Sequence, residues 1–112
     1  MMYQYKAHIC NIVDADTVDA DIRLGFGIQV KLRLRVLDFD APETFHPSCQ
    51  AEREHGKEAT NKAMEMLLDK KVVIHTKKKG KYGRYLAHIF IEGKDFAVEM
   101  REAGFQKKDT YD

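Results

Sequence analysis

Three short polar clusters in the chain carry the side chains that could do chemistry. The first contains Asp14 and Asp16, the second runs from Arg35 to Thr44, and the third is Lys-Tyr-Gly-Arg at 81–84. Carboxylates are the ligands that a hard cation such as calcium prefers, and the planar guanidinium of arginine binds phosphate through paired donors. One further carboxylate can serve as a base for water. Together these residue types are the minimum needed to hydrolyse a phosphodiester bond.

The first cluster has two possible interpretations. Asp14 and Asp16 are two residues apart, so in an extended chain their side chains share a face. Neighbouring carboxylates repel each other unless a cation or water separates them. The same spacing is also common in turns, where aspartate accepts hydrogen bonds from its own backbone. The residues alone leave both a cation site and a simple turn open.

The second cluster combines an arginine with two acids. Arg35 lies on the polar face near the end of a predicted strand, and Asp40 and Glu43 follow in the loop, with Pro42 restricting the backbone between them. If the fold brings Asp16 beside this loop, Asp16 and Asp40 can share a cation and Glu43 can act as a base for nearby water. The alternative is that Arg35 forms an ordinary surface ion pair, which stabilises little, and that the loop is a plain turn.

The third cluster begins another predicted strand. Both faces of this strand are partly apolar, so we expect Arg84 to be half-buried and to need an acidic partner or an anionic ligand. Lys81 and Tyr82 are predicted to contact a phosphate or to stack on a base. The lysine-rich segment 77–81 can equally be a solvated turn between strands.

Apolar and polar residues alternate through the first part of the chain. This pattern predicts strands over residues 3–13, 18–24 and 28–36, with Gly25-Phe26-Gly27 as a hairpin turn. A loop without regular pattern follows, from about residue 38 to 50.

The rest of the chain mixes helices and strands. A helix is predicted from residue 51 or 53 to 69, and its apolar stripe consists of Ala59, Ala63, Met66 and Leu67. Further predicted elements are a strand beginning at 72–74, a strand over 85–91, and a helix over 95–103 with Asp95 at its start and Gly104 after its end. Five strands with a helix between the third and fourth predict a mainly β, α+β fold, an OB-fold barrel forming one domain over residues 1–112.

Composition excludes several classes of protein. The 112 residues are 44% hydrophobic and 33% charged, as in ordinary globular proteins. The net charge of +1 is not that of a passive nucleic-acid binder. No apolar run approaches the roughly 20 residues that span a bilayer, and the start of the chain does not resemble a signal peptide. We therefore expect either an intracellular protein or a secreted one whose leader has been removed. Cys10 and Cys49 are expected to be unpaired thiols.

The order and spacing of the three clusters resemble the thermonuclease family, the staphylococcal-nuclease-like proteins. The likeness runs from about residue 7 to 104 and rests on Asp14-Ala-Asp16-Thr17-Val18, on the segment 35–44, and on 81–84. The resemblance implies an OB-fold that binds calcium through Asp16, Asp40 and the carbonyl of Ala41. It implies Glu43 as general base, Arg35 and Arg84 on the scissile phosphate, Lys81 and Tyr82 on a neighbouring phosphate, and Tyr111 stacked on the nucleotide.

Two features depart from the family pattern. Ala41 stands where threonine is frequent, a change that a carbonyl ligand tolerates. The chain ends at Asp112, without the usual third helix, and its aromatic residues after the second helix are reduced to Tyr111. This departure bears on base stacking and on the stability of the domain.

The resemblance implies a calcium-dependent nuclease, endo- or exonucleolytic, that acts on DNA and RNA. Contacts to phosphate rather than to bases predict little base specificity. We expect single-stranded or frayed substrates, 3′-phosphate products, a monomer, and no membrane partner. The alternatives are a non-catalytic OB-fold module that binds nucleic acid or protein, and a purely structural barrel. The presence of all five carboxylates and arginines of the site favours the enzyme.

Overall fold

Three long strands form the first part of the barrel. The computed structural model describes residues 3–44, 47–76 and 85–111. Strands β1 (Tyr3–Asp14), β2 (Thr17–Gly25) and β3 (Ile28–Val36) pair antiparallel in chain order. Their bounds confirm the strands that the alternating pattern predicts, because one face of each strand is buried and the other is not.

Two further strands close the sheet on itself. β4 (Lys71–Thr76) pairs antiparallel with β1, and β5 (Tyr85–Ile91) pairs antiparallel with β4. β5 then pairs in parallel with the end of β3, where Leu34 lies opposite Tyr85. The result is a closed, five-stranded mixed barrel with two helices, which confirms the predicted OB-fold.

A sixth, very short strand was not predicted. β6 (Lys94–Asp95) pairs with the end of β5. Two residues cannot show a periodic pattern, so nothing in the sequence distinguishes this strand from a simple connection between the predicted strand over 85–91 and the predicted helix over 95–103.

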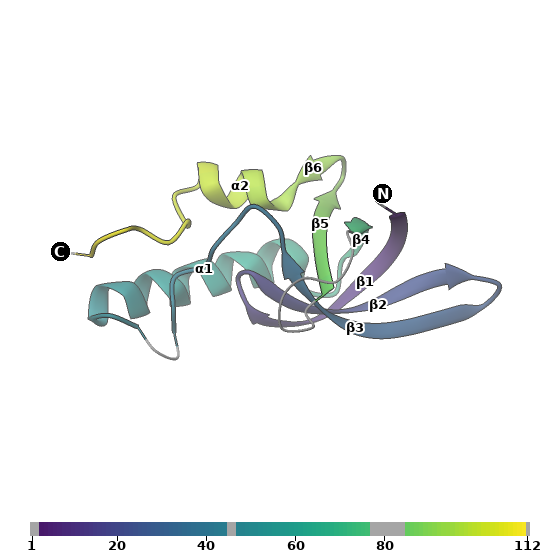
Figure 1. The fold of residues 1–112 in the computed structure, drawn as a ribbon, viewed down its shortest axis with the longest axis horizontal. Helices are drawn as coiled ribbons and strands as arrows, with labels where there is room; N and C mark the ends of the chain where they lie inside the picture. The colour runs from purple at the N-terminus through teal and green to yellow at the C-terminus, as the bar shows by residue number, and fades with distance from the viewer. Residues whose placement is uncertain (1–2, 45–46, 77–84, 112) are drawn as a thin grey trace.

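The two helices lie on one side of the barrel (Figure 1). α1 (Gln50–Leu67) connects β3 to β4, and α2 (Phe96–Glu102) follows β6. Asp95 caps α2 as predicted, because its side chain accepts hydrogen bonds from the amides of Ala97 and Val98. Gly104 has a φ of 87° and ends the helix. Within the described residues, the chain after α2 forms no third helix.

The core lies between the barrel strands and the helices. β-strand residues such as Val18, Ile74 and Ile89 are fully buried inside the barrel. Phe39, from the loop after β3, meets Phe96 of α2 edge to face, with ring centroids 6.4 Å apart. This contact attaches the loop that carries Asp40 to the second helix.

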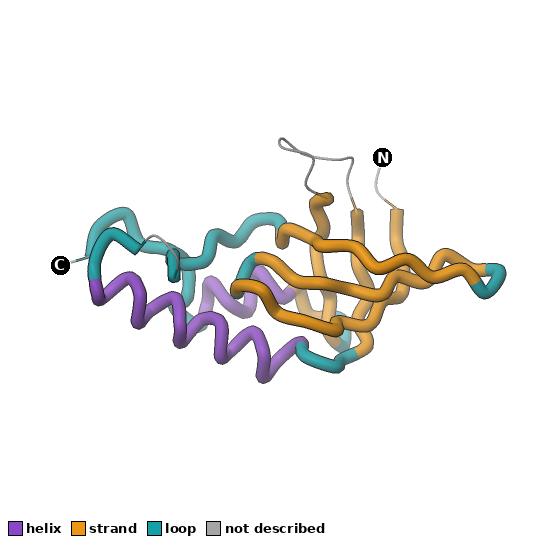
Figure 2. Tube along the Cα trace, turned by 90° about the horizontal axis from the view of Figure 1, so that it is seen from below, coloured by secondary structure: helices purple, strands orange, loops and turns teal. Residues whose placement is uncertain are grey.

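The β2–β3 hairpin projects away from the helices, as the two views agree (Figures 1 and 2). Its turn contains Phe26 and Gly27, both with positive φ (55° and 75°). Phe26 is fully exposed, and Leu24 and Ile28 beside it are also exposed. Two consecutive left-handed residues are the geometry of the tightest hairpin turns.

Among the described residues, no helix has the length and apolar composition needed to cross a bilayer.

Candidate active site

The turn between β1 and β2 holds Asp16 against the loop after β3. Asp14 ends β1 and pairs with Thr17, so Ala15 and Asp16 form the hairpin turn. The Asp16 carboxylate accepts hydrogen bonds from the Thr17 hydroxyl (3.0 Å) and from the amide of Ala41 (2.9 Å). The cluster does lie at a turn, but these two hydrogen bonds come from a side chain and from a distant amide rather than from the amides of the turn itself. The turn places the Asp16 carboxylate at the loop of the second cluster.

Arg35 is the centre of the cluster. Its guanidinium Nη2 lies 2.6 Å from Asp40 Oδ1 and 3.3 Å from Asp16 Oδ2. Its Nη1 donates to the carbonyls of Val36 (2.6 Å) and Phe39 (2.7 Å). The side chain is only 18% exposed. This is more than a surface ion pair, because one guanidinium organises the strand end and both aspartates.

Asp14 lies close to the carboxylates of Asp16 and Glu43. Burial raises the pKa of the Asp14 carboxyl, and the charges of Asp16 and Glu43 raise that pKa further. The Thr44 hydroxyl donates to Asp14 at 3.4 Å and opposes the shift, as does the charge of Arg35. The pKa shift shows that the carboxylates of the first and second clusters act on one another across the turn.

Glu52, in the first turn of α1, holds the loop that carries Glu43 through hydrogen bonds to the loop's backbone. The Glu52 carboxylate accepts hydrogen bonds from the amides of Ser48 (2.6 Å) and Glu43 (3.3 Å) and lies 3.5 Å from Lys107 Nζ. Glu52 is buried. Its pKa is lowered to about 2, first by the Ser48 amide and then by the Glu43 amide, the Ser48 side chain and the Lys107 charge, against the effect of burial. Glu43 itself remains exposed.

The C-terminal segment covers one side of the cluster. The amide of Asp40 donates to Gln106 Oε1 (3.1 Å), and the amide of Lys107 donates to the carbonyl of Asp40 (2.8 Å). A cavity of about 460 Å³ lies between this segment and the acidic loop. Its lining consists of Asp16, Arg35, Asp40, Ala41, Glu43, Gln106, Lys107, Lys108 and Asp109.

The structure thus brings together five of the predicted site residues. Asp16, Arg35, Asp40, Ala41 and Glu43 line the cavity. Lys81, Tyr82 and Arg84 lie outside the described residues, so their predicted contacts with phosphate stay predictions.

Tyr111 does not line the acidic cavity, although its neighbour Lys108 lines both that cavity and the hollow beside α1. Its hydroxyl hydrogen-bonds His55 Nδ1 (2.7 Å) and accepts from the Lys108 amide (3.1 Å). Tyr111 lines a different hollow beside α1, with His55 and Glu58 among its neighbours. Stacking of Tyr111 on a nucleotide stays a prediction.

Asp16 and Asp40 supply the oxygen ligands that a hard cation prefers, and both carboxylates face the same point. Asp16 and Asp40 both reach the same nitrogen of Arg35, so their carboxylates already converge on a single positive charge. Calcium takes 6–8 oxygen ligands. Among the described residues no group of three His, Cys, Asp or Glu side chains is placed to hold a metal ion. Two carboxylates and the Ala41 carbonyl would therefore need water and a phosphate to complete the coordination.

Sequence reasoning missed several residues of this site. Glu52 sits three positions after the Cys49 N-cap, where an acid commonly satisfies free amides, and this was a signal that could have been read. Gln106 and Lys107 follow the last helix without any pattern, and only the fold shows that they reach Asp40. Gly56 is buried against the carbonyls of Pro42 and Glu43, a close approach that gives a reason for glycine in a helix.

A closed OB-fold barrel with acids and an arginine gathered around a polar cavity defines a nuclease-like OB-fold domain. Residues 33–111 match the family model of staphylococcal nuclease homologues. This match covers well over half of the chain, which therefore belongs to that family, and the predicted resemblance is confirmed. A search of curated proteins finds no match. The family match begins within β3 and does not include Asp14 or Asp16. These two residues are placed beside the site by the turn between β1 and β2.

Proposed function

We propose that the protein is a calcium-dependent nuclease that hydrolyses phosphodiester bonds of DNA and RNA. The observation that carries this proposal is the convergence of Asp16 and Asp40 on one guanidinium nitrogen, with Glu43 on the same cavity. Membership of the staphylococcal nuclease homologues supports a nuclease or nucleic-acid-binding role. Phosphate contacts dominate the proposed site, so base specificity should be low.

In this proposal each side chain of the cavity has one task. Asp16, Asp40 and the Ala41 carbonyl would hold calcium, which would polarise a phosphoryl oxygen as a Lewis acid. Glu43 takes the proton from the attacking water. Arg35 holds the equatorial oxygens as their charge grows. By resemblance to the family, we expect hydrolysis to release the 5′ oxygen and to leave a 3′-phosphate.

In this scheme Arg35 must give up some of its contacts within the protein before it can bind a phosphate. Its guanidinium is shared between two aspartates and two carbonyls. A cation bound by the aspartates would replace part of that charge, and the arginine would then be available to a phosphate. Calcium and substrate should accordingly bind with positive cooperativity, since each removes a cost for the other.

The second candidate is a non-catalytic OB-fold module. One observation favours it: Arg35 already neutralises the aspartates within the protein, and no three-residue metal group lies among the described residues. Such a module would bind nucleic acid or protein without cleaving it.

Plasmid digestion separates the two candidates. Purified protein should cleave DNA in millimolar calcium and stop in excess EGTA. Glu43→Gln should retain oligonucleotide binding but lose about 10²–10⁴-fold in turnover, as expected for a general base. Asp40→Ala should weaken calcium binding measured by calorimetry. Glu58→Gln, on the exposed face of α1, is the matched control and should cleave normally. Binding without cleavage in calcium would favour the module.

A further inference from the structure

A second cavity lies on the barrel and is separate from the acidic site. It has a volume of about 590 Å³ and is formed by β1, the end of β2, β4 and β5. Its lining includes Val73 of β4, which is partly exposed, and Val72 and Ala7, which belong to the buried core. Lys6 precedes Asp14 by eight residues on β1, about 26 Å along an extended strand. None of the cavity's lining residues lines the acidic site.

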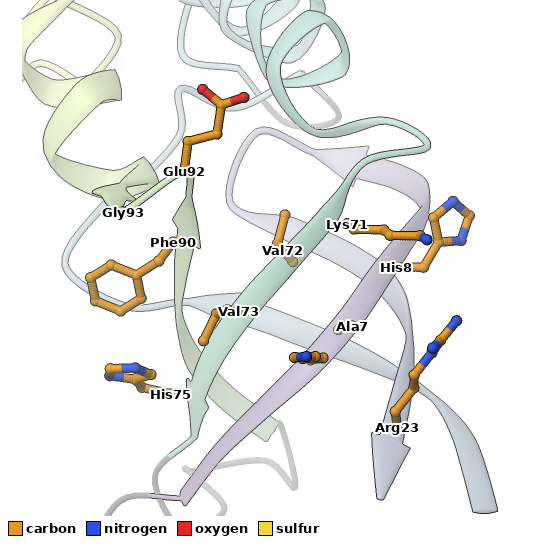
Figure 3. Close-up of a pocket in the computed structure, with 11 residues that line it drawn as sticks. Ala7, His8, Arg23, Lys71, Val72, Val73, His75, Phe90, Glu92 and Gly93 are labelled. Carbon is orange, nitrogen blue, oxygen red and sulfur yellow. The ribbon is translucent and has the colours of Figure 1, made fainter. Parts of the chain in front are cut away.

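One side of this cavity is aromatic. The rings of His75 and Phe90 lie 4.5 Å apart at an angle of 42°. Both residues are half-buried, so part of each ring borders the open cavity. Figure 3 shows Phe90, Val73 and His75 grouped together on the β4–β5 side. A partly exposed aromatic pair is a surface on which a nucleic-acid base can stack.

The other side of the cavity is basic. Lys71 and Arg23 project on the side away from Phe90 (Figure 3), and Lys6 of β1 also lines the cavity. None of the ion pairs formed among the described residues includes Lys6, Arg23 or Lys71. Three unpaired cations around one hollow attract an anion such as phosphate.

The nearby acids reduce this positive charge without cancelling it. Glu92 lines the cavity, but Figure 3 places it at the end opposite Arg23. Asp69 lies 3.6 Å from His8, and Asp21 faces His8 across the β1–β2 pair. Asp21 also faces Lys31 on β3. The cations therefore outnumber the carboxylates among the lining residues.

Strand register arranges these groups in one row. Lys6 pairs with Val73, and Val73 pairs with Phe90. Neighbouring strands are about 4.8 Å apart, so the row extends roughly 10 Å from the lysine backbone to the phenylalanine backbone. It presents a cation, an apolar side chain and an aromatic ring in sequence. A nucleotide presents phosphate, sugar and base in the same order.

We propose that this cavity is a second binding site for single-stranded nucleic acid, with a base on Phe90 and His75 and phosphates on Lys6, Arg23 and Lys71. The inference rests on the proposed function for its ligand class. It adds a contact distant from the cleaved bond, so it should raise affinity for long strands and leave short substrates unaffected.

The test measures binding and cleavage separately. Binding of a fluorescently labelled single-stranded 20-mer is followed by anisotropy in EDTA at several salt concentrations, with strand integrity checked on a gel. Cleavage is followed in calcium on a short chromogenic nucleotide diester that fills only the acidic site. Lys6→Gln/Lys71→Gln should lower the affinity for the 20-mer and reduce the salt slope by about 1.4, or about 0.7 per lost phosphate contact.

Two controls make this result specific. Lys57→Gln/Lys62→Gln removes the same charge from α1, outside the cavity, and should leave affinity and slope close to wild type. Phe90→Leu keeps an apolar side chain but removes the ring, and should lose about tenfold or more in affinity. Melting curves verify that each variant is folded. All these variants should cleave the short diester at the wild-type rate.

The outcomes are distinguishable. A Lys6→Gln/Lys71→Gln variant that binds the 20-mer like wild type, with the same salt slope, overturns the second site even if the enzyme cleaves DNA. Wild type that does not bind the 20-mer also overturns it and leaves the cavity to another class of ligand. Wild type that binds through these residues but cleaves nothing supports the second site and contradicts the proposed nuclease.

Discussion

At the scale of single residues, Arg35 combines two kinds of contact in one side chain. Its Nη1 holds the carbonyls of Val36 and Phe39, and its Nη2 holds Asp16 and Asp40. The first pair of contacts fixes the backbone where β3 ends. The second pair holds the two acids around one positive charge. A lysine has the charge but not the planar fork that makes both pairs of contacts.

Arg35→Lys should therefore lose both stability and turnover. We expect a decrease in turnover of about 10²–10³-fold, as for loss of a transition-state donor, and a lower melting temperature. Arg33→Lys is the control, because Arg33 lies exposed on the same strand, where it makes its own paired contact with Asp19 (2.8 and 3.3 Å) outside the cavity. Turnover on plasmid DNA and thermal melts provide the measurement. Equal behaviour of the two variants would show that the fork of Arg35 is not used.

Glu52 predicts a specific response to acid. Its pKa is lowered from 4.5 to about 2, so the unfolded chain takes up the proton more readily than the folded one between these values. The stabilisation is complete above about pH 4.5 and is lost as the pH falls toward 2. Glu52→Gln should be less stable than wild type at neutral pH and should lack this part of the acid dependence. Denaturant unfolding between pH 2 and 6 measures the difference.

The exposed neighbour Glu54 supplies the control for this experiment. Glu54 only accepts a hydrogen bond from Gln50 at 3.2 Å. Glu54→Gln should keep the wild-type acid dependence. An acid transition that survives unchanged in Glu52→Gln would assign the stabilisation to other carboxylates.

At the scale of elements, the contact between α1 and the loop after β3 sets the position of Glu43. Gly56 is the point of closest approach, where an added Cβ would lie 2.7 Å from Thr44 Cγ2 and 2.8 Å from the Pro42 carbonyl oxygen. Such distances require the helix or the loop to move. The glycine weakens the helix by about 1 kcal/mol relative to alanine and in return allows the helix to pack against the loop.

Gly56→Ala should consequently reduce activity although it favours the helix. Overpacking typically costs about 1–3 kcal/mol, and misplacement of a reacting group by about 1 Å can cost roughly 10²-fold in rate. We expect a small loss of stability with a larger loss of turnover. Lys57→Ala, at the next and exposed position, is the control. Higher stability with full activity in Gly56→Ala would contradict a close-packed loop.

The sequence predicted these elements better than it predicted their contacts. β3 begins and ends where alternation places it, because a strand with one buried face repeats every two residues. α1 begins at Gln50 and ends at Leu67, rather than at 51 or 53 and at 69, since helix ends depend on caps more than on periodicity. Its buried face includes Glu52 and Gly56, which an apolar pattern cannot identify.

The candidate site was predictable only where residue type alone implies chemistry. Asp16, Arg35, Asp40 and Glu43 carry charges that need partners, and their spacing resembles a known family. The Gln106 side chain at the Asp40 amide is 66 residues away in sequence. Nothing in a local pattern indicates such a contact, because the barrel and α2 decide where the C-terminal segment lies.

At the scale of the whole molecule, the C-terminal segment is attached to α1 through His55. His55 Nε2 lies 2.8 Å from the Gly104 carbonyl, and its Nδ1 lies 2.7 Å from the Tyr111 hydroxyl. A carbonyl can only accept, so in the neutral imidazole Nε2 carries the proton and the Tyr111 hydroxyl donates to Nδ1. The Phe105 ring stacks on the imidazole with centroids 6.2 Å apart. These contacts hold the segment that carries Gln106 and Lys107.

Tyr111→Phe separates this structural role from base stacking. Loss of the hydroxyl should cost about 0.5–1.5 kcal/mol, and its effect should not add to that of His55→Ala because the two groups share one hydrogen bond. A phenyl ring would still stack on a base. Nucleotide affinity and unfolding free energy, measured for both single variants and the double variant, decide the role. Additive costs would show that the pair does not interact.

The parallel pairing of β3 with β5 has a consequence for the order in which the protein folds. Leu34 and Tyr85 are 51 residues apart in sequence, and their pairing closes the barrel. Contacts over such separations form late, because the entropy of closing the loop must be overcome first. During synthesis, the β1–β3 meander can pair locally as soon as it emerges. The acidic loop that follows it acquires its helix, its C-terminal cover and its final shape only when almost the entire chain is available.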